Sequence, residues 1–191
     1  MMQKQFILIL ITLCLALSCK DDVLPKPKGY LRLEYPNAIY EKADTPLPFS
    51  FDKNKVAQPL TTVKTANKVY GIDVKYPSLK GTIYLTYKKI EHNNLDSLLR
   101  DAQNLTQKHT IKADEIIESE YLNKEANVYG MIYEIGGNAA SQSQFYVTDS
   151  TKHFLSGSLY FYAKPNYDSI YPAAEYLKKD IVRIMESIRW K

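Results

Sequence analysis

The chain has 191 residues, of which 45% are hydrophobic and 24% are charged, and its formal net charge is +4. These values exclude a disordered or collagen-like chain and favour one globular domain with a substantial core. The basic residues are scattered along the chain, so the charge gives no reason to expect nucleic acid as a partner.

The first 18 residues are predicted to be a signal peptide. Lys4 is their only charged residue, and residues 6–17 (FILILITLCLAL) are apolar or nearly so. A charged start followed by a short apolar run is typical of an export signal, whereas a membrane-spanning helix needs about 20 apolar residues.

Cys19 is the predicted lipidation site. Small Ser18 stands directly before it, and residues 16–19 (ALSC) resemble a lipobox, the cleavage motif of bacterial lipoproteins. The resemblance implies that cleavage makes Cys19 the first residue of the mature chain, with acyl chains such as palmitate that hold it to a membrane. The alternatives are a simple secreted protein that is cleaved nearby, or cleavage at Cys14, which the large Leu13 disfavours.

Residues 19–29 are predicted to be a lipidated tether, because Pro25 and Pro27 favour an extended path. Residues 30–67 follow as an extended, proline-containing N-terminal segment. Within it we expect a short strand over residues 30–36 and a candidate edge strand over 49–51, with residues 37–62 otherwise mostly irregular.

The remaining residues, 68–191, are predicted to form an α+β domain. Alternating apolar residues predict strands over 69–76, 82–88, 114–122, 127–135, 143–148 and 153–162. Helical spacing predicts one amphipathic helix over 95–108, capped by Asn94, and a second one that is capped by Asp168 or Ser169 and extends to Ile188.

The order of these elements predicts an antiparallel sheet of about six strands packed by two amphipathic helices. The order is similar to that of the PsbP/Mog1 type of α/β/α sandwich. This similarity concerns the fold alone and carries no function.

The sequence shows no pattern that is typical of catalysis or metal binding, so we predict no enzymatic activity, no cofactor and no metal. His92, His109 and His153 have no partner at metal-binding spacing. Glu118 and Glu120 are spaced like an acid/base pair on a strand, but solvated strand faces commonly show the same pattern.

Residues 24–36 (LPKPKGYLRLEYP) closely resemble the start of the mature gliding-motility lipoprotein GldD of Bacteroidetes. The chain length and residues 187–190 (SIRW) also fit this family. The resemblance implies a lipoprotein that is required for gliding motility and linked to the type IX secretion apparatus. It carries over no catalytic residues.

We therefore expect an assembly or accessory protein of the cell envelope that contacts other gliding and secretion proteins and takes no small-molecule substrate. The candidate contacts are Lys26, Lys28, Tyr30 and Arg32, since an extended segment can add to a partner's sheet edge. We expect a lipid anchor in the outer membrane, on its periplasmic face rather than the cell surface. Residues 20–22 (KDD) resemble a surface-export signal, but they begin directly after the cysteine.

The alternative hypothesis is a ligand-binding envelope lipoprotein. The chain contains 16 tyrosines against six phenylalanines. Tyrosine suits a half-buried sheet surface, and it is also enriched at binding surfaces. A pocket lined by apolar and Tyr side chains is therefore the second prediction.

Overall fold

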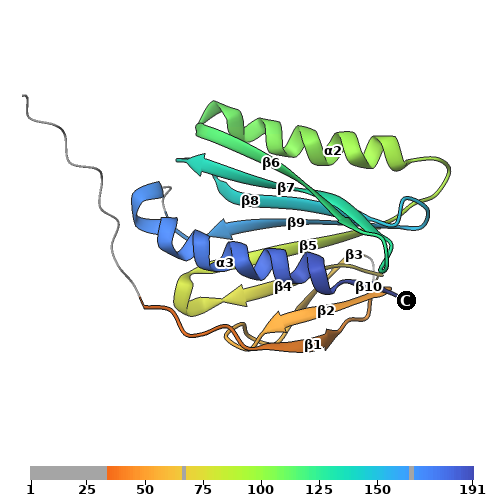
Figure 1. Ribbon diagram of the computed structural model, residues 1–191, viewed down its shortest axis with the longest axis horizontal. Coiled ribbons are helices and arrows are strands. Elements are labelled where there is room, and N and C mark those ends of the chain that lie inside the picture. Colours follow the sequence, from red (N-terminus) through yellow and green to blue (C-terminus); the bar gives the residue numbers. More distant parts are fainter. Residues whose placement is uncertain (1–33, 66–67, 164–165) are drawn as a thin grey trace, which may run out of the picture.

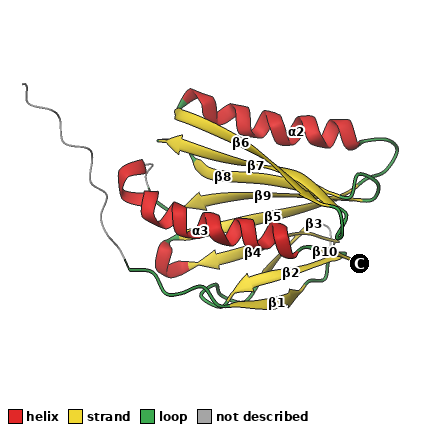
Figure 2. Ribbon diagram, in the orientation of Figure 1, coloured by secondary structure: helices red, strands yellow, loops and turns green. Residues whose placement is uncertain are grey.

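The computed structural model describes residues 34–65, 68–163 and 166–191. These residues form two antiparallel sheets and two helices, which confirms the predicted α+β class (Figures 1 and 2). The helices are α2 (Leu95–Gln107) and α3 (Tyr167–Ser187), and two short 3₁₀ turns accompany them, η1 (Pro77–Leu79) and η2 (Lys108–Ile111). No helix in this part of the chain is long and apolar enough to cross a membrane.

The large sheet has seven strands in the order β3-β4-β5-β9-β8-β7-β6. Every neighbouring pair is antiparallel. The chain passes through three adjacent strands, crosses by way of α2 to the far edge, and returns through four strands until β9 lies beside β5. The strands are β3 (Thr61–Thr65), β4 (Lys68–Tyr76), β5 (Gly81–Lys89), β6 (Ala113–Asn123), β7 (Val128–Gly137), β8 (Ser141–Thr148) and β9 (His153–Phe161).

The six strands that the sequence predicts for residues 68–191 correspond to β4–β9, and their ends agree within two residues. The seventh strand, β3, was not predicted. It consists of residues 61–65 (TTVKT), and all of these except Val63 are exposed. A strand that contributes so little to the core has no apolar alternation by which the sequence could reveal it.

α3 covers one face of the large sheet. Its apolar stripe packs against alternate residues of the central strands, and these side chains are at most 1% exposed: Ile83, Leu85, Leu155, Leu159, Leu177, Ile181 and Ile184. Stripe and strands belong to one continuous cluster, which is the main core of the protein.

α2 covers the opposite face. Leu98 packs there in a smaller cluster with Tyr133, Tyr146 and Phe154. Phe145 belongs to the main core while its neighbour Tyr146 belongs to this smaller cluster, as expected for successive residues of a strand. The two helices therefore enclose the sheet, which confirms the prediction of two packed helices. The similarity to the PsbP/Mog1 fold stays a prediction.

The small sheet has three strands in the order β1-β2-β10, and it lies below α3 in Figure 1. Its strands are β1 (Tyr40–Asp44), β2 (Phe49–Asn54) and β10 (Arg189–Trp190). Phe49 and Phe51 of β2 are at most 1% exposed and join the main core.

Two predictions for the N-terminal segment are wrong. Residues 37–62 are not mostly irregular, because Pro46 and Pro48 lie in the connection between β1 and β2 and interrupt neither strand. The predicted edge strand over 49–51 is the central strand of the small sheet. Part of a third prediction also fails: residues 34–36 form no strand, and residues 30–33 lie outside the described part of the chain.

The helix caps differ from the prediction as well. Asn94 precedes α2, but its side chain makes no capping bond and instead accepts a hydrogen bond from the Glu91 amide at 2.9 Å. α3 begins after Asn166, so Asp168 lies inside the first turn rather than at the cap.

Candidate functional site

The site residues that the sequence predicts all precede the first described residue. Cys19, Lys26, Lys28, Tyr30 and Arg32 lie outside the described part of the chain. The predictions for these residues therefore stay predictions, and the clefts of the folded domain are the candidate sites.

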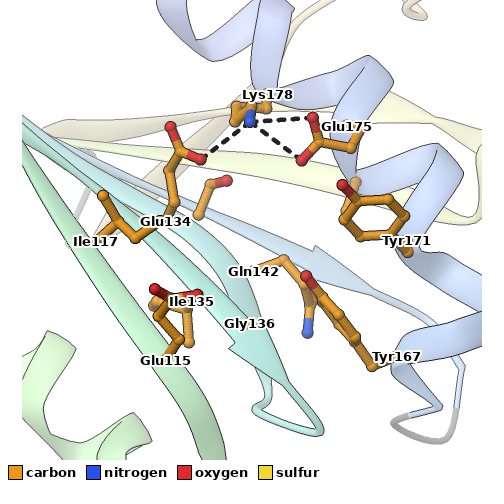
Figure 3. Close-up of a pocket in the computed structure, with 12 residues that line it drawn as sticks. Glu115, Ile117, Glu134, Ile135, Gly136, Gln142, Tyr167, Tyr171, Glu175 and Lys178 are labelled. Atoms are coloured by element: carbon orange, nitrogen blue, oxygen red, sulfur yellow. Dashed lines mark hydrogen bonds and ion pairs between the residues drawn. The ribbon is translucent and has the colours of Figure 1, made fainter. Parts of the chain in front are cut away.

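A cleft of about 210 Å³ opens between α3 and the strands β6, β7 and β8. Figure 3 shows Lys178 beside Glu134 and Glu175, with Tyr167 and Tyr171 along the helical wall. Glu115 of β6 and two residues of β8, Gln142 and Ser143, complete the polar lining. The cleft exists because α3 packs over the centre of the sheet and leaves the β6 edge uncovered on that face.

Lys178 is the central charge of this cleft. Its Nζ lies 2.9 Å from Oε2 of Glu134 and 3.0 Å from the carboxylate of Glu175, its neighbour three residues earlier on the helix. Partial burial opposes the charge on the ammonium group, but the hydrogen bonds that it donates to Glu134 and Glu175 outweigh this effect and raise the pKa of Lys178. Lys178 is therefore a fixed cation that links α3 to β7.

The cleft has an excess of negative charge. Three carboxylates, of Glu115, Glu134 and Glu175, border it together with the one ammonium group of Lys178. Such a lining favours a cationic group over an anionic one. The α3 wall is held by the Tyr167 amide, which donates to the side chain of Asn138 at 2.9 Å.

No pattern in the sequence indicates this cleft. Lys178 appears in the sequence only as one of several charged residues on the polar side of a helix. The spacing of Glu175 and Lys178 predicts a pair on one helix face, but the third member, Glu134, lies 44 residues away from Lys178. Their meeting depends on the order of strands in the sheet.

The predicted carboxylate pair does not belong to this cleft. Glu118 and Glu120 are exposed. Burial and, after it, the nearby negative charge of Glu118 raise the pKa values of Tyr133 and Tyr146 in the α2-side cluster, and Glu120 adds to the effect on Tyr146. They thus lie on a solvated strand face, which is the more common reason for this spacing.

The three histidines lie apart in the fold. His92 is exposed in a turn, His109 is bonded to Gln144 at 2.9 Å, and His153 is bonded to the Tyr87 hydroxyl at 2.8 Å. Within the described ranges, no group of three or more His, Cys, Asp or Glu side chains has a geometry that fits a metal ion.

A second cleft, of about 220 Å³, lies beneath α2 and is relevant to the ligand-binding alternative. Leu98, Tyr133 and Phe154 line it together with Thr106 and Gln144, which are joined by a 2.8 Å hydrogen bond. It is thus partly apolar and contains one tyrosine. Both clefts are smaller than the roughly 300–1,000 Å³ that is usual for small-molecule sites.

The comparisons with known proteins agree with the resemblance found in the sequence. A family model described as "Gliding motility lipoprotein GldD" matches residues 20–190. A search of curated proteins finds no match. The matched range contains every described residue except Lys191.

Proposed function

We propose a function from one premise: the chain belongs to the gliding motility lipoprotein GldD family. Membership implies a role in gliding motility and a membrane-anchored place in the cell envelope. Beyond this, we propose that the protein is an assembly or accessory component of the gliding machinery and the associated type IX secretion apparatus. Its function lies in contacts with other envelope proteins.

The observation that carries the proposal is the extent of the family match. It begins at residue 20, directly after Cys19, and continues through the tether and the folded domain to residue 190. A lipid on Cys19 would hold the domain at the outer membrane, for which we propose the periplasmic face. The tether then limits the domain to partners close to that surface.

We propose Lys26, Lys28, Tyr30 and Arg32 as contacts of the tether with a partner. Three of them are basic, and the two prolines among residues 24–29 favour an extended path. An extended segment can pair with the edge of a partner's sheet, with its side chains giving specificity.

The two clefts are small, and the larger hollows on the described surface, of about 310 to 640 Å³, are wide open to solvent, which favours protein contacts over small-molecule binding. We propose that the protein acts without enzymatic activity or a cofactor. The ligand-binding alternative predicts a saturable rise in melting temperature with lipids or glycans. A broad panel that gives no rise would leave the contact function as the better account.

The test is co-purification after mild cross-linking of membranes from gliding cells. We expect gliding or secretion proteins to co-purify with the wild-type chain, and to be lost from a variant that combines Lys26→Gln, Lys28→Gln, Tyr30→Ala and Arg32→Gln. A matched control replaces the exposed Lys124, Lys152 and Lys179 with Gln. Two results together would refute the proposal: a wild-type chain that always behaves as a lone monomer, and normal gliding of cells from which the chain has been deleted.

A further inference from the structure

Within residues 34–65, 68–163 and 166–191, the outer edge of β6 has no strand partner. β6 is 11 residues long and forms one end of the large sheet, and β7 is its one strand partner within the described residues. No other described segment makes a backbone hydrogen bond to residues 113–123. The outward N–H and C=O groups of a long strand are therefore available to another chain.

The opposite edge of the same sheet is different. β3 is only five residues long, and its register is interrupted between Val63 and Lys64. Short and bulged strands are a common protection against edge pairing. In β6 the irregularity lies at the start, between Ala113 and Glu115, and the register is unbroken from Glu115 to Asn123. Of the two edges of the large sheet in the described part of the chain, only that of β6 is long and regular.

Large apolar side chains are exposed along this edge. Ile117 is 46% exposed and Leu122 is 64% exposed, and Ile111, just before the strand, is 86% exposed. Few other large hydrophobic side chains of the described chain are so exposed. Ile117 lies on the α3 face and Leu122 on the α2 face, so an added strand could cover an exposed apolar side chain on either face.

The charge of β6 selects among the chains that could pair with it. The strand has four acidic residues, Asp114, Glu115, Glu118 and Glu120, and no basic one. Two copies of β6 side by side would place like charges together, which disfavours a symmetric dimer through this edge. A basic strand would meet opposite charges instead.

A strand added to β6 would have different neighbours on the two faces of the sheet. On the α3 side, Glu115 and Ile117 border the acidic cleft that contains Glu134. On the α2 side, Glu120 and Leu122 border a shallower depression together with Leu95 and Leu99. Successive side chains of a strand point to opposite faces, so Glu118, Glu120 and Leu122 share the α2 face. Basic side chains of an added strand would therefore lie on the α2 face near Glu118 and Glu120, and apolar ones on the α3 face near Ile117.

We propose that β6 receives an extended, basic segment of a partner protein, in which Lys or Arg alternates with apolar residues. This inference rests on the proposed contact function and adds to it a docking edge and the chemistry of the partner. The segment pairs with the backbone of β6, and its basic side chains face the carboxylates of Glu118 and Glu120.

The binding test uses the purified full chain and a labelled peptide of about nine residues in which Lys and Val alternate. We expect saturable binding that weakens as salt rises, and no binding of a peptide in which Glu replaces Lys. Glu118→Lys with Glu120→Lys should weaken binding by about tenfold or more. The matched control, Asp101→Lys with Glu186→Lys, makes the same charge change at exposed helical positions and should leave binding within about threefold.

Hydrogen exchange locates the contact. Bound Lys-Val peptide should slow exchange of backbone amides in residues 115–123 and leave those of β3 unchanged. Equal protection of both edges, no protection of β6, or equal binding by both charge variants would overturn the proposal. So would a concentration-dependent dimer that buries β6 in the absence of peptide.

The same variants separate this inference from the proposed function. If cells with Glu118→Lys and Glu120→Lys retain every cross-linked envelope partner, the β6 docking edge is wrong while the contact function stands. If the wild-type chain itself captures no gliding or secretion protein, the contact function is wrong, whatever the peptide does in solution.

Discussion

The Tyr40 hydroxyl donates a 2.6 Å hydrogen bond to the carboxylate of Asp180, which lies 140 residues further along the chain. Asp180 is only 2% exposed and also accepts a hydrogen bond from Asn54 at 3.1 Å. Burial and, after it, Asp180 raise the pKa of Tyr40, so the phenol stays protonated and continues to donate. One buried carboxylate thus joins β1 and β2 of the small sheet to α3.

We expect Asp180→Ala to lower the free energy of unfolding by about 2–4 kcal/mol, because it leaves Tyr40 and Asn54 without their buried acceptor. Tyr40→Phe should cost about 1 kcal/mol. Urea denaturation measures both, with Tyr70→Phe at a more exposed tyrosine as the control. If the two effects simply add in the double variant, the side chains act independently and this account of the junction fails.

Two glycines of β7 should respond differently to alanine. A Cβ at Gly130 would lie 1.9 Å from the Tyr146 carbonyl oxygen of the adjacent strand, whereas one at Gly136 would meet nothing closer than 3.6 Å. Gly130→Ala is expected to cost more than about 2 kcal/mol, since a backbone atom cannot move aside. Gly136→Ala is the matched control and should change the melting temperature little. Similar melting temperatures for the two variants would contradict the close approach.

The ion pairs of Lys178 should make a measurable contribution to stability. Its side chain is 23% exposed and that of Glu134 is 35% exposed, so solvent screens the pair only in part. We expect Lys178→Met to cost about 1 kcal/mol, with part of the loss recovered when Glu134→Gln removes the unpaired charge. Denaturation at low and high salt measures this contribution. A loss that the second substitution does not reduce would show that packing, and not charge, is responsible.

Acid should weaken the fold through two histidines. Burial lowers the pKa of His109 below the ordinary value of 6.5. Burial also lowers the pKa of His153, although the negative charge of Asp149 partly opposes this shift. A lowered pKa means that, as the pH falls, these histidines take up protons in the unfolded chain before they do so in the folded one. Their contribution to the free energy of unfolding is therefore complete above pH 6.5 and is lost as the pH falls through and below that value.

Urea denaturation between about pH 7.5 and 5 tests this expectation. His109→Gln combined with His153→Gln should flatten the decline, and His92→Asn in an exposed turn should not. A decline of unchanged slope in the double variant would assign the acid sensitivity to other groups.

The anchor predicts a difference between two cysteines. Cys19→Ser should move the protein from the membrane fraction and abolish the added lipid mass, because no acyl chain remains to hold it. Cys14→Ser is the matched control, since Cys14 is expected to leave with the signal peptide. Fractionation and mass spectrometry of the mature protein decide. The same fraction and the same mass for wild type and Cys19→Ser would refute the lipid anchor.

The sequence predicts best those elements whose side chains alternate strongly. Residues 149–152 (DSTK) also have the composition of a turn, and the reason is local: the Asp149 carboxylate accepts backbone hydrogen bonds from Thr151, Lys152 and His153. These interactions lie within four residues of one another, so composition reveals them.

The order of strands in the sheet and the acidic cleft could not be predicted in this way. Glu134 contacts Lys178 only because the chain crosses the sheet by way of α2 before β7 forms. The rings of Phe49 and Trp190, whose centroids are 6.4 Å apart, meet only because β10 pairs with β2. β10 has two residues and is a strand only because it pairs with β2. Such short strands form through tertiary contacts, which a local pattern does not encode.

The pairing of β5 with β9 sets the order in which this protein can be completed. Gly81 pairs with Phe161, and β2 receives β10 only when Trp190 arrives opposite Phe49. During synthesis, β5 and β2 must therefore remain without these partners until almost the whole chain has emerged. Contacts of such long sequence separation slow folding, and until they form the unpaired strand edges are exposed and prone to aggregation. A ribosome that stalls before β9 would release a chain with an unfinished centre, and such a chain would need a chaperone to stay soluble.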